Sequence, residues 1–96
     1  MRAKRESLQV IYDILEAIRN KDGKIKPTHI MYKANLSHQM LKEYLADLMS
    51  RGFVVEQKNK KGNLTYSLST KGFSYLSEFS VIEKFMNSFG LDEEQE

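Results

Sequence analysis

The chain has 96 residues, of which 41% are hydrophobic, and it contains no cysteine. This length predicts one domain with a single modest core, and the absence of thiols excludes disulfides and thiolate metal sites. No apolar run approaches the ~20 residues of a membrane span, and the first ten residues lack the apolar segment of a signal peptide. We therefore expect a cytoplasmic protein without a membrane partner.

The formal net charge of +2 conceals an uneven distribution of charge along the chain. The acidic tail, residues 92–96, holds four carboxylates and no basic residue, which leaves fifteen basic and nine acidic residues in 1–91. A basic body is typical of proteins that bind a polyanion, although a surface that only confers solubility can have the same composition. Charge alone leaves both interpretations open.

The first predicted helix covers residues 5–20 and carries an apolar stripe at helical spacing. The stripe consists of Leu8, Ile11, Leu15 and Ile18. Gly23 is the expected terminator of this helix. A basic group precedes the helix on an arm that we expect to be mobile: Arg2, Lys4 and Arg5. Such arms add affinity for nucleic acid without reading its sequence, but charged termini without a function are equally common.

The next segment predicts a short helix. The preceding "KIK" is long enough for one bridging strand only. Pro27 and Thr28 mark the helix start, since proline suits a first turn and threonine can cap it. The helix ends near Ala34, and its expected core residues are Ile30 and Met31.

A tight turn at Asn35 and Leu36 leads into the third predicted helix, His38 to Arg51, with Ser37 as its N-cap. Its inward stripe is formed by Leu41, Leu45, Leu48 and Met49. Two helices joined by so short a turn indicate a helix-turn-helix, whose second helix can be inserted into a partner.

The segment after Gly52, the expected terminator of the third helix, predicts a β-hairpin. Residues 53–55 begin the first strand, and apolar and hydroxyl side chains alternate in the second. The apolar positions of the second strand are Leu64, Tyr66 and Leu68. The connecting "KNKKGN" is polar and turn-forming, so the hairpin has a basic tip.

The last predicted helix is capped by Thr70, extends to about Phe89 and ends at Gly90. Its apolar residues are spaced 4, 3, 4 and 3 apart, which is the spacing of a coiled-coil seam: Tyr75, Phe79, Ile82, Met86 and Phe89. This seam predicts a homodimer. The alternative is that the first helix of the same chain covers the whole stripe.

Four further apolar residues of this helix lie off the seam. Phe73 and Leu76 are expected to pack on the hairpin and the first helix. Val81 and Phe85 widen the apolar surface beyond what a monomer usually exposes. They therefore strengthen the prediction of a partner.

This order of elements predicts a mostly α, α+β fold: a winged helix-turn-helix followed by a C-terminal dimerisation helix. "THIMYKANLS", "LKEYLADLMSRGFV" and "YSLSTKGFSYL" resemble the archaeal ten-kilodalton winged-helix DNA-binding family, the "10a"-type chromatin proteins. The resemblance covers residues 5–78. It implies binding to double-stranded DNA and dimerisation through an antiparallel coiled coil. The expected division is a DNA-binding domain over 1–70, a dimerisation helix over 71–91 and the acidic tail.

The start of the third helix offers side chains that can read DNA, since a recognition helix places its N-terminal residues against base edges in the major groove. These candidates are Ser37, His38, Gln39 and Lys42. Glutamine can pair with adenine, and lysine can reach phosphate or guanine. Glu43 and Asp47 limit the contact to the first two turns. An ordinary solvated helix face is the alternative.

The hairpin tip carries more positive charge than a turn requires, because turns need glycine or asparagine. Its candidate DNA-binding residues are Lys58, Asn59, Lys60 and Lys61. We expect contact with backbone phosphates, although lysine also protects edge strands from aggregation. Lys33, at the end of the second helix, is a further candidate.

Enzymatic motifs are not found in the sequence. His29 and His38 are nine residues apart, and no third ligand follows at the spacing of known metal sites. The glycines do not form a phosphate-binding loop, and no nucleophile motif occurs. We expect no catalysis, metal, cofactor or small-molecule ligand.

The residues and the resemblance together predict a dimeric, nucleoid-associated protein of architectural type, which binds double-stranded DNA with low sequence specificity and bends or bridges it. Two alternatives stay open. One is a sequence-specific winged-helix transcriptional regulator. The other is a winged helix that binds only proteins, which predicts an apolar recognition face and a wing without excess lysine.

Overall fold

The computed structural model describes the backbone of residues 2–22 and 24–90, and side chains from residue 7 onward. The acidic tail therefore lies outside the described residues. The elements in chain order are α1 (Arg2–Asn20), α2 (Pro27–Ala34), α3 (His38–Ser50), β1 (Val54–Lys58), β2 (Leu64–Leu68) and α4 (Thr70–Ser88). Among the described helices, none is sufficiently long and apolar to cross a membrane.

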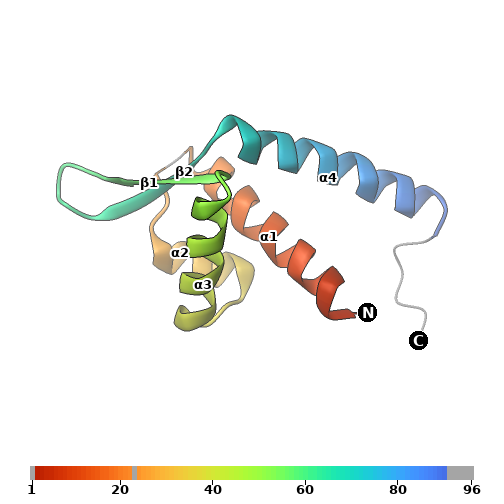
Figure 1. Ribbon diagram of the computed structural model, residues 1–96, viewed down its shortest axis with the longest axis horizontal. Coiled ribbons are helices and arrows are strands. Elements are labelled where there is room, and N and C mark those ends of the chain that lie inside the picture. The colour runs from red at the N-terminus through yellow and green to blue at the C-terminus, as the bar shows by residue number, and fades with distance from the viewer. Residues whose placement is uncertain (1, 23, 91–96) are drawn as a thin grey trace.

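The hairpin and α4 leave the helical body in opposite directions. Figure 1 shows the β1–β2 hairpin extending to the left, while α4 runs over α1 and continues to the right. The start of α1 and the end of α4 lie at the same end of the molecule, away from the hairpin. The two strands pair antiparallel, from Val54 opposite Leu68 to Lys58 opposite Leu64.

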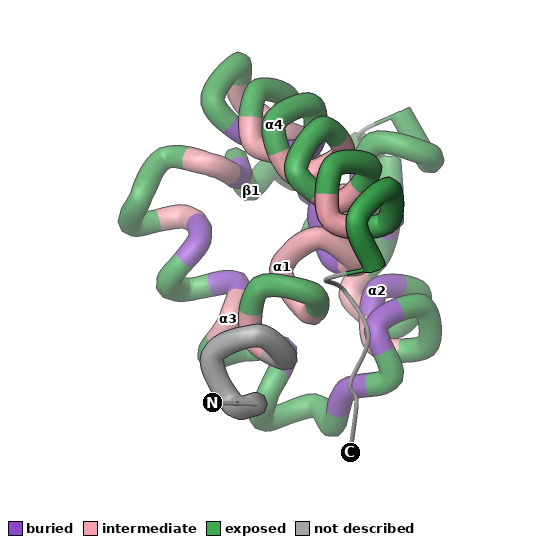
Figure 2. The backbone as a smooth tube through the Cα atoms, turned by 90° about the vertical axis from the view of Figure 1, so that its right-hand side faces the viewer, coloured by how far each residue is buried: buried purple, intermediate pink, exposed green. Residues whose placement is uncertain are grey.

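The core lies where α1, α2, α3 and the base of the hairpin meet. Its fully buried side chains are Ile14, Leu15, Ile18, Ile25, Ile30 and Leu48. Leu41, Leu45, Val54, Tyr66 and Leu76 complete it from α3, the strands and α4. Figure 2 shows that α4 is exposed over most of its surface. The predicted core stripes are thus confirmed except at Leu8, which is 43% exposed near the start of α1.

α1 ends at Asn20 as predicted, but it begins earlier than the prediction. The helix begins at Arg2, so the basic group expected on a mobile arm belongs to its first turns, although those side chains lie outside the described residues. Gly23, the expected terminator, is also outside the described residues. Asp22 adopts a left-handed backbone with φ 56°, and its N–H donates to the Arg19 carbonyl. An aspartate can take this conformation at lower cost than most residues.

The helix-turn-helix depends on short-range backbone chemistry. Pro27 is the first residue of α2, and Lys26 rather than Thr28 is its N-cap, so the predicted threonine cap is wrong. Proline suits this position because the N–H it lacks has no partner in the first turn. Asn35 ends α2 in a left-handed conformation with φ 56°. The Ser37 Oγ then accepts the Met40 N–H at 3.1 Å, which confirms the predicted cap of α3.

The end of α3 leads directly into the hairpin. The N–H groups of Gly52 and Phe53 donate to the carbonyls of Met49 and Leu48 at 3.1 and 2.9 Å. This is a Schellman motif, and it requires the left-handed backbone that Gly52 adopts at φ 83°. Phe53 therefore belongs to the turn, and β1 begins one residue later than predicted.

The start of α4 is fastened to the base of the hairpin. Ser69, not Thr70, caps the helix, because its Oγ accepts the Gly72 N–H at 3.1 Å. Leu76 is buried as predicted, whereas Phe73 is 52% exposed and lines an open groove together with Tyr12 and Arg19 of α1.

Candidate nucleic-acid interface

We call Ser37, His38, Gln39 and Lys42 the recognition face. All four are exposed at the N-terminal end of α3. Leu41, Leu45 and Leu48 form the buried side of the helix, whereas these four residues belong to its N-cap and first turns and are open to solvent. The structure thus brings the predicted recognition residues together on one open surface.

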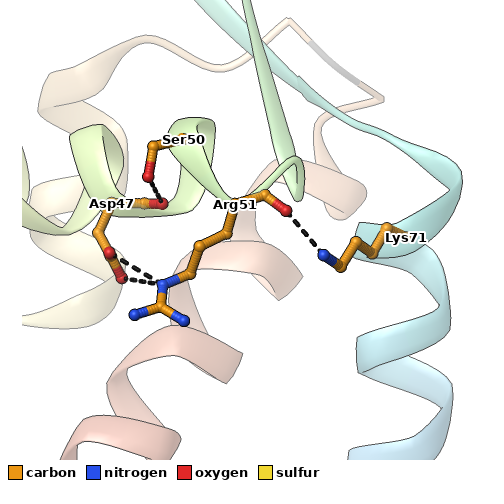
Figure 3. A network of polar contacts seen from close by, with 4 residues as sticks. All are labelled: Asp47, Ser50, Arg51 and Lys71. Carbon is orange, nitrogen blue, oxygen red and sulfur yellow. Dashed lines mark hydrogen bonds and ion pairs between the residues drawn. The ribbon is translucent and has the colours of Figure 1, made fainter.

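Two acidic residues next to the recognition face are already engaged. The Gln39 Nε2 donates to a Glu43 carboxylate oxygen at 3.0 Å. This bond uses one amide hydrogen and leaves the other hydrogen and the carbonyl oxygen, the pair that adenine recognition requires. The Asp47 carboxylate accepts both of its contacts from the Arg51 Nε, at 2.9 and 3.0 Å (Figure 3). Arg51, which the sequence did not single out, neutralises the acid closer to the end of α3.

We call Lys58, Lys60 and Lys61 the wing lysines. All three are exposed, and none forms an ion pair with another described residue. The Asn59 Oδ1 accepts the N–H groups of Lys61 and Asn63 at 2.9 and 3.0 Å, so this side chain shapes the turn. Lys60 and Lys61 are therefore held at the tip of the hairpin by an Asx-type turn.

The base of the hairpin is fixed by Tyr66. Its side chain is buried at 4% exposure, and its OH donates to the Glu56 carboxylate at 2.9 Å. Burial, reinforced by this hydrogen bond and the adjacent negative charge, raises the pKa of Tyr66 to about 12. The wing lysines thus project from a rigid support.

The other predicted DNA-binding residues are less informative. Lys33 is exposed in the last turn of α2, and the side chains of Arg2, Lys4 and Arg5 lie outside the described residues. His29 and His38 are both exposed. Within residues 7–22 and 24–90, His, Asp and Glu form no group of three that could hold a metal ion.

A polar junction joins the end of α3 to the start of α4. The Lys71 Nζ donates to the Arg51 carbonyl at 2.8 Å, as Figure 3 shows, and lies 4.8 Å from the centre of the Phe53 ring. The Ser69 N–H and Oγ both donate to the Phe53 carbonyl, at 3.1 and 3.2 Å. Lys71 of α4 and its N-cap Ser69 thereby bind the backbone carbonyls of residues 51 and 53, which follow α3.

The predicted seam of α4 divides into two parts. Tyr75 donates its OH to the Leu8 carbonyl at 3.4 Å, and Phe79 stacks on Tyr12 with ring centroids 4.7 Å apart. These two seam residues therefore pack on α1 of their own chain. The rest of the apolar surface, which we call the α4 stripe, comprises Val81, Ile82, Phe85, Met86 and Phe89. Its members other than Met86 are 56–66% exposed.

A helix-turn-helix, a capped helix with an open polar face and a following hairpin define the class of winged helix-turn-helix proteins. The chain belongs to the winged helix-turn-helix family, whose model matches residues 4–87. This match confirms the predicted winged helix-turn-helix fold, while dimerisation through the C-terminal helix stays a prediction.

Two uncharacterised proteins of the archaeon Methanocaldococcus jannaschii are similar in sequence. MJ0287 is 34% identical over 87 residues, which is 91% of this chain and 82% of that protein. MJ0290 is 35% identical over 79 residues, 82% of this chain but 34% of its own length, so the chain spans about a third of that relative. Both relatives agree with the predicted resemblance to archaeal winged-helix proteins.

Solved structures share the fold at low sequence identity. Sso10a-2, a DNA-binding protein from Sulfolobus solfataricus, has a TM-score of 0.70 and 21% identity over 85% of this chain and 82% of its own. The PcaV transcriptional regulator from Streptomyces coelicolor has a TM-score of 0.75 and 18% identity over 84% of this chain and 58% of its own. MepR, a transcription regulator of Staphylococcus aureus, has a TM-score of 0.74 and 10% identity over 90% and 65%.

Proposed function

We propose that the protein binds double-stranded DNA as a homodimer, with low sequence specificity, and bends or bridges the duplex as an architectural protein. The observation that carries this proposal is the open recognition face on the same winged helix as the three exposed wing lysines. An α-helix fits the major groove, and lysines on an adjacent hairpin reach backbone phosphates. A nucleoid-associated location in the cytoplasm belongs to the same proposal.

In this mechanism α3 enters the major groove with its N-terminal end foremost. Gln39 meets a base edge while Glu43 holds its amide, and Lys42 reaches phosphate or guanine one turn later. The wing lysines contact the backbone beside that groove. Few side chains address bases and several address phosphates, a ratio that favours affinity over sequence discrimination.

Dimerisation is assigned to α4. Four of the five residues in the α4 stripe are more than half exposed, and the rings of Phe85 and Phe89 contact each other, with centroids 4.9 Å apart. A second copy of the stripe would remove this apolar surface from water. The antiparallel orientation comes from the family resemblance. Two winged domains joined at α4 would hold their recognition faces apart, as bending or bridging requires.

A sequence-specific transcriptional regulator is the second candidate. It is favoured by the fold shared with the transcription regulators PcaV and MepR. A winged helix that binds only proteins fits less well, since the recognition face is polar and the wing is basic. The proposal includes no catalysis, and the predicted lack of a cofactor stays a prediction.

Fluorescence titration against random-sequence duplex at two salt concentrations tests DNA binding. We expect binding that weakens as salt increases, because lysines displace counterions from phosphates. Binding-site selection then separates the first two candidates: an enriched motif supports the regulator, and an unenriched pool supports the architectural protein. Salt-independent or absent binding would leave the protein-binding alternative.

Ile82→Asp tests the dimer. Ile82 is 56% exposed within one chain, so the change should leave the fold intact while burying two unpaired charges between the chains of a dimer. Ser77→Asp places the same charge on an exposed part of α4 outside the stripe and is the matched control. Analytical ultracentrifugation should show a dimer for the parent and the control, and a folded monomer for Ile82→Asp. A monomeric parent at tens of micromolar would refute dimerisation.

A further inference from the structure

The segment before α2 adds a third, short strand position beside the hairpin. Ile25 forms an isolated antiparallel bridge with Tyr66 of β2 and is 1% exposed. Because side chains alternate in extended chain, Lys24 and Lys26 both point away from the core that Ile25 enters. We call Lys24 and Lys26 the strand lysines. Sequence reasoning missed them, although the alternation in "KIK" is the signal that could have found them.

The strand lysines and the wing form one concave polar surface. Lys58 and Asn59 from the hairpin line it together with Lys24 and Lys26. The remaining lining residues are Asp22, Gln57, Thr65 and Ser67. The lining residues thus carry three ammonium groups and one carboxylate, together with amide and hydroxyl groups. Phosphate oxygens accept hydrogen bonds from all of these donors, and the lining offers no aromatic ring on which a base could stack.

Folding gives no reason for lysine at these two positions. Both side chains are exposed, and neither forms an ion pair with another described residue. Lys26 is the N-cap of α2 without making a side-chain capping bond, and a cation at a helix N-terminus opposes the helix dipole. A residue that destabilises the helix it belongs to is expected where function requires that residue.

The position of this surface suits contact with the same duplex that meets the wing. Figure 1 shows the segment leading into α2 beside the base of the hairpin, at the end of the molecule opposite the last turns of α4. A dimer formed through the α4 stripe would leave this end open. The surface also shares Lys58 and Asn59 with the wing, so the two basic regions are continuous.

We infer that Lys24 and Lys26 extend the phosphate-contacting surface from the wing to the start of α2, so that the backbone of one duplex passes over both. This inference rests on the proposed DNA binding. The contacts involve phosphates alone and should contribute equally on any duplex sequence.

The test is Lys24→Gln/Lys26→Gln in the full chain. Binding to one AT-rich and one GC-rich duplex is measured over a salt series, with circular dichroism to verify folding. The matched control is Lys21→Gln/Lys84→Gln, which removes the same charge from exposed positions outside the surface. The slope of log K against log salt changes by about 0.9 for each phosphate contact. We expect the strand-lysine variant to lose up to ~1.8 of slope per winged domain on both duplexes, and the control to keep the parental slope.

The outcomes separate this inference from the proposed function. A parent that binds both duplexes and a strand-lysine variant with the parental slope would overturn the inference and leave DNA binding standing. An equal loss in the control would also overturn it, since net charge rather than contact would then explain the effect. A loss on one duplex only would refute contact by phosphates alone. A parent that binds neither duplex would overturn both proposals.

Discussion

Gly72→Ala should destabilise the protein, although alanine is the better helix former. Gly72 lies in the first turn of α4, where the helix crosses the start of the hairpin. A Cβ atom at this position would lie closer than 3.0 Å to the Phe53 carbonyl oxygen and 3.3 Å from two carbon atoms of the Leu68 side chain. The nearest obstacle is therefore backbone, and the Phe53 carbonyl is already fixed by its hydrogen bonds from Ser69.

Two opposing effects decide the magnitude. Replacing glycine by alanine inside a helix stabilises it by roughly 1 kcal/mol. Forcing an extra methyl group into a packed site costs about 1–3 kcal/mol, and the upper part of that range applies because backbone must move. We expect a net loss of about 1–2 kcal/mol in the free energy of unfolding. For a domain of this size, each kcal/mol lowers the melting temperature by roughly 4–8 °C.

Urea denaturation followed by circular dichroism measures this difference, at one protein concentration because dimerisation would contribute to stability. Ser74→Ala, at an exposed position of the same helix, is the matched control and should be neutral or slightly stabilising. If Gly72→Ala were stabilised by as much as helix propensity predicts, the close approach of α4 to the Phe53 carbonyl would be refuted.

Three further predictions concern the site and its support. Replacing the three wing lysines by alanine should flatten the slope of log K against log salt by up to ~0.9 per lost contact. An unchanged slope would show that the wing does not contact the phosphate backbone of the duplex. Gln39→Ala and Lys42→Ala should weaken duplex binding while changing the free energy of unfolding by less than ~0.5 kcal/mol. Leu45→Ala should instead lower the free energy of unfolding by ~2–5 kcal/mol. Intact binding in the first two variants would mean that α3 is a scaffold only. The raised pKa of Tyr66, about 12 against an ordinary 10.0, means that stability is full below pH 10 and declines as pH rises toward 12. Urea titrations across this range should show a weaker decline in Tyr66→Phe than in the parent or in Tyr32→Phe, which alters an exposed ring; equal declines would contradict the assignment.

Elements whose chemistry is local were predictable from the sequence. The leucines of α3, the Ser37 cap and the left-handed Gly52 follow from spacing and residue type, and the structure contains all three. The predicted N-cap of α4 was one residue too late, because Ser69 and Thr70 are both good caps. Ser69 is distinguished by its tertiary hydrogen bonds to the Gly52 and Phe53 carbonyls.

Tertiary packing explains most of what sequence reasoning missed. The heptad spacing of α4 identified its apolar residues but not which of them pack on α1. Tyr75 donates to the carbonyl of Leu8, 67 residues away in the chain, and Phe79 stacks on Tyr12. Lys24 and Lys26 are brought beside the hairpin by the bridge between Ile25 and Tyr66, which pairs two distant segments of the chain. The recognition face itself was predictable because exposure on an amphipathic helix follows from its buried side.

The polar junction, of which Figure 3 shows Lys71 and Arg51, holds the end of α3 against the start of α4. Lys71 and Ser69 hold the carbonyls of residues 51 and 53, so the angle between α3 and α4 is fixed by main-chain atoms that every substitution on the outer face of α3 leaves in place. A substitution at an outward side chain of α3 can therefore change what the helix presents to a partner while the hydrogen bonds that hold its end remain.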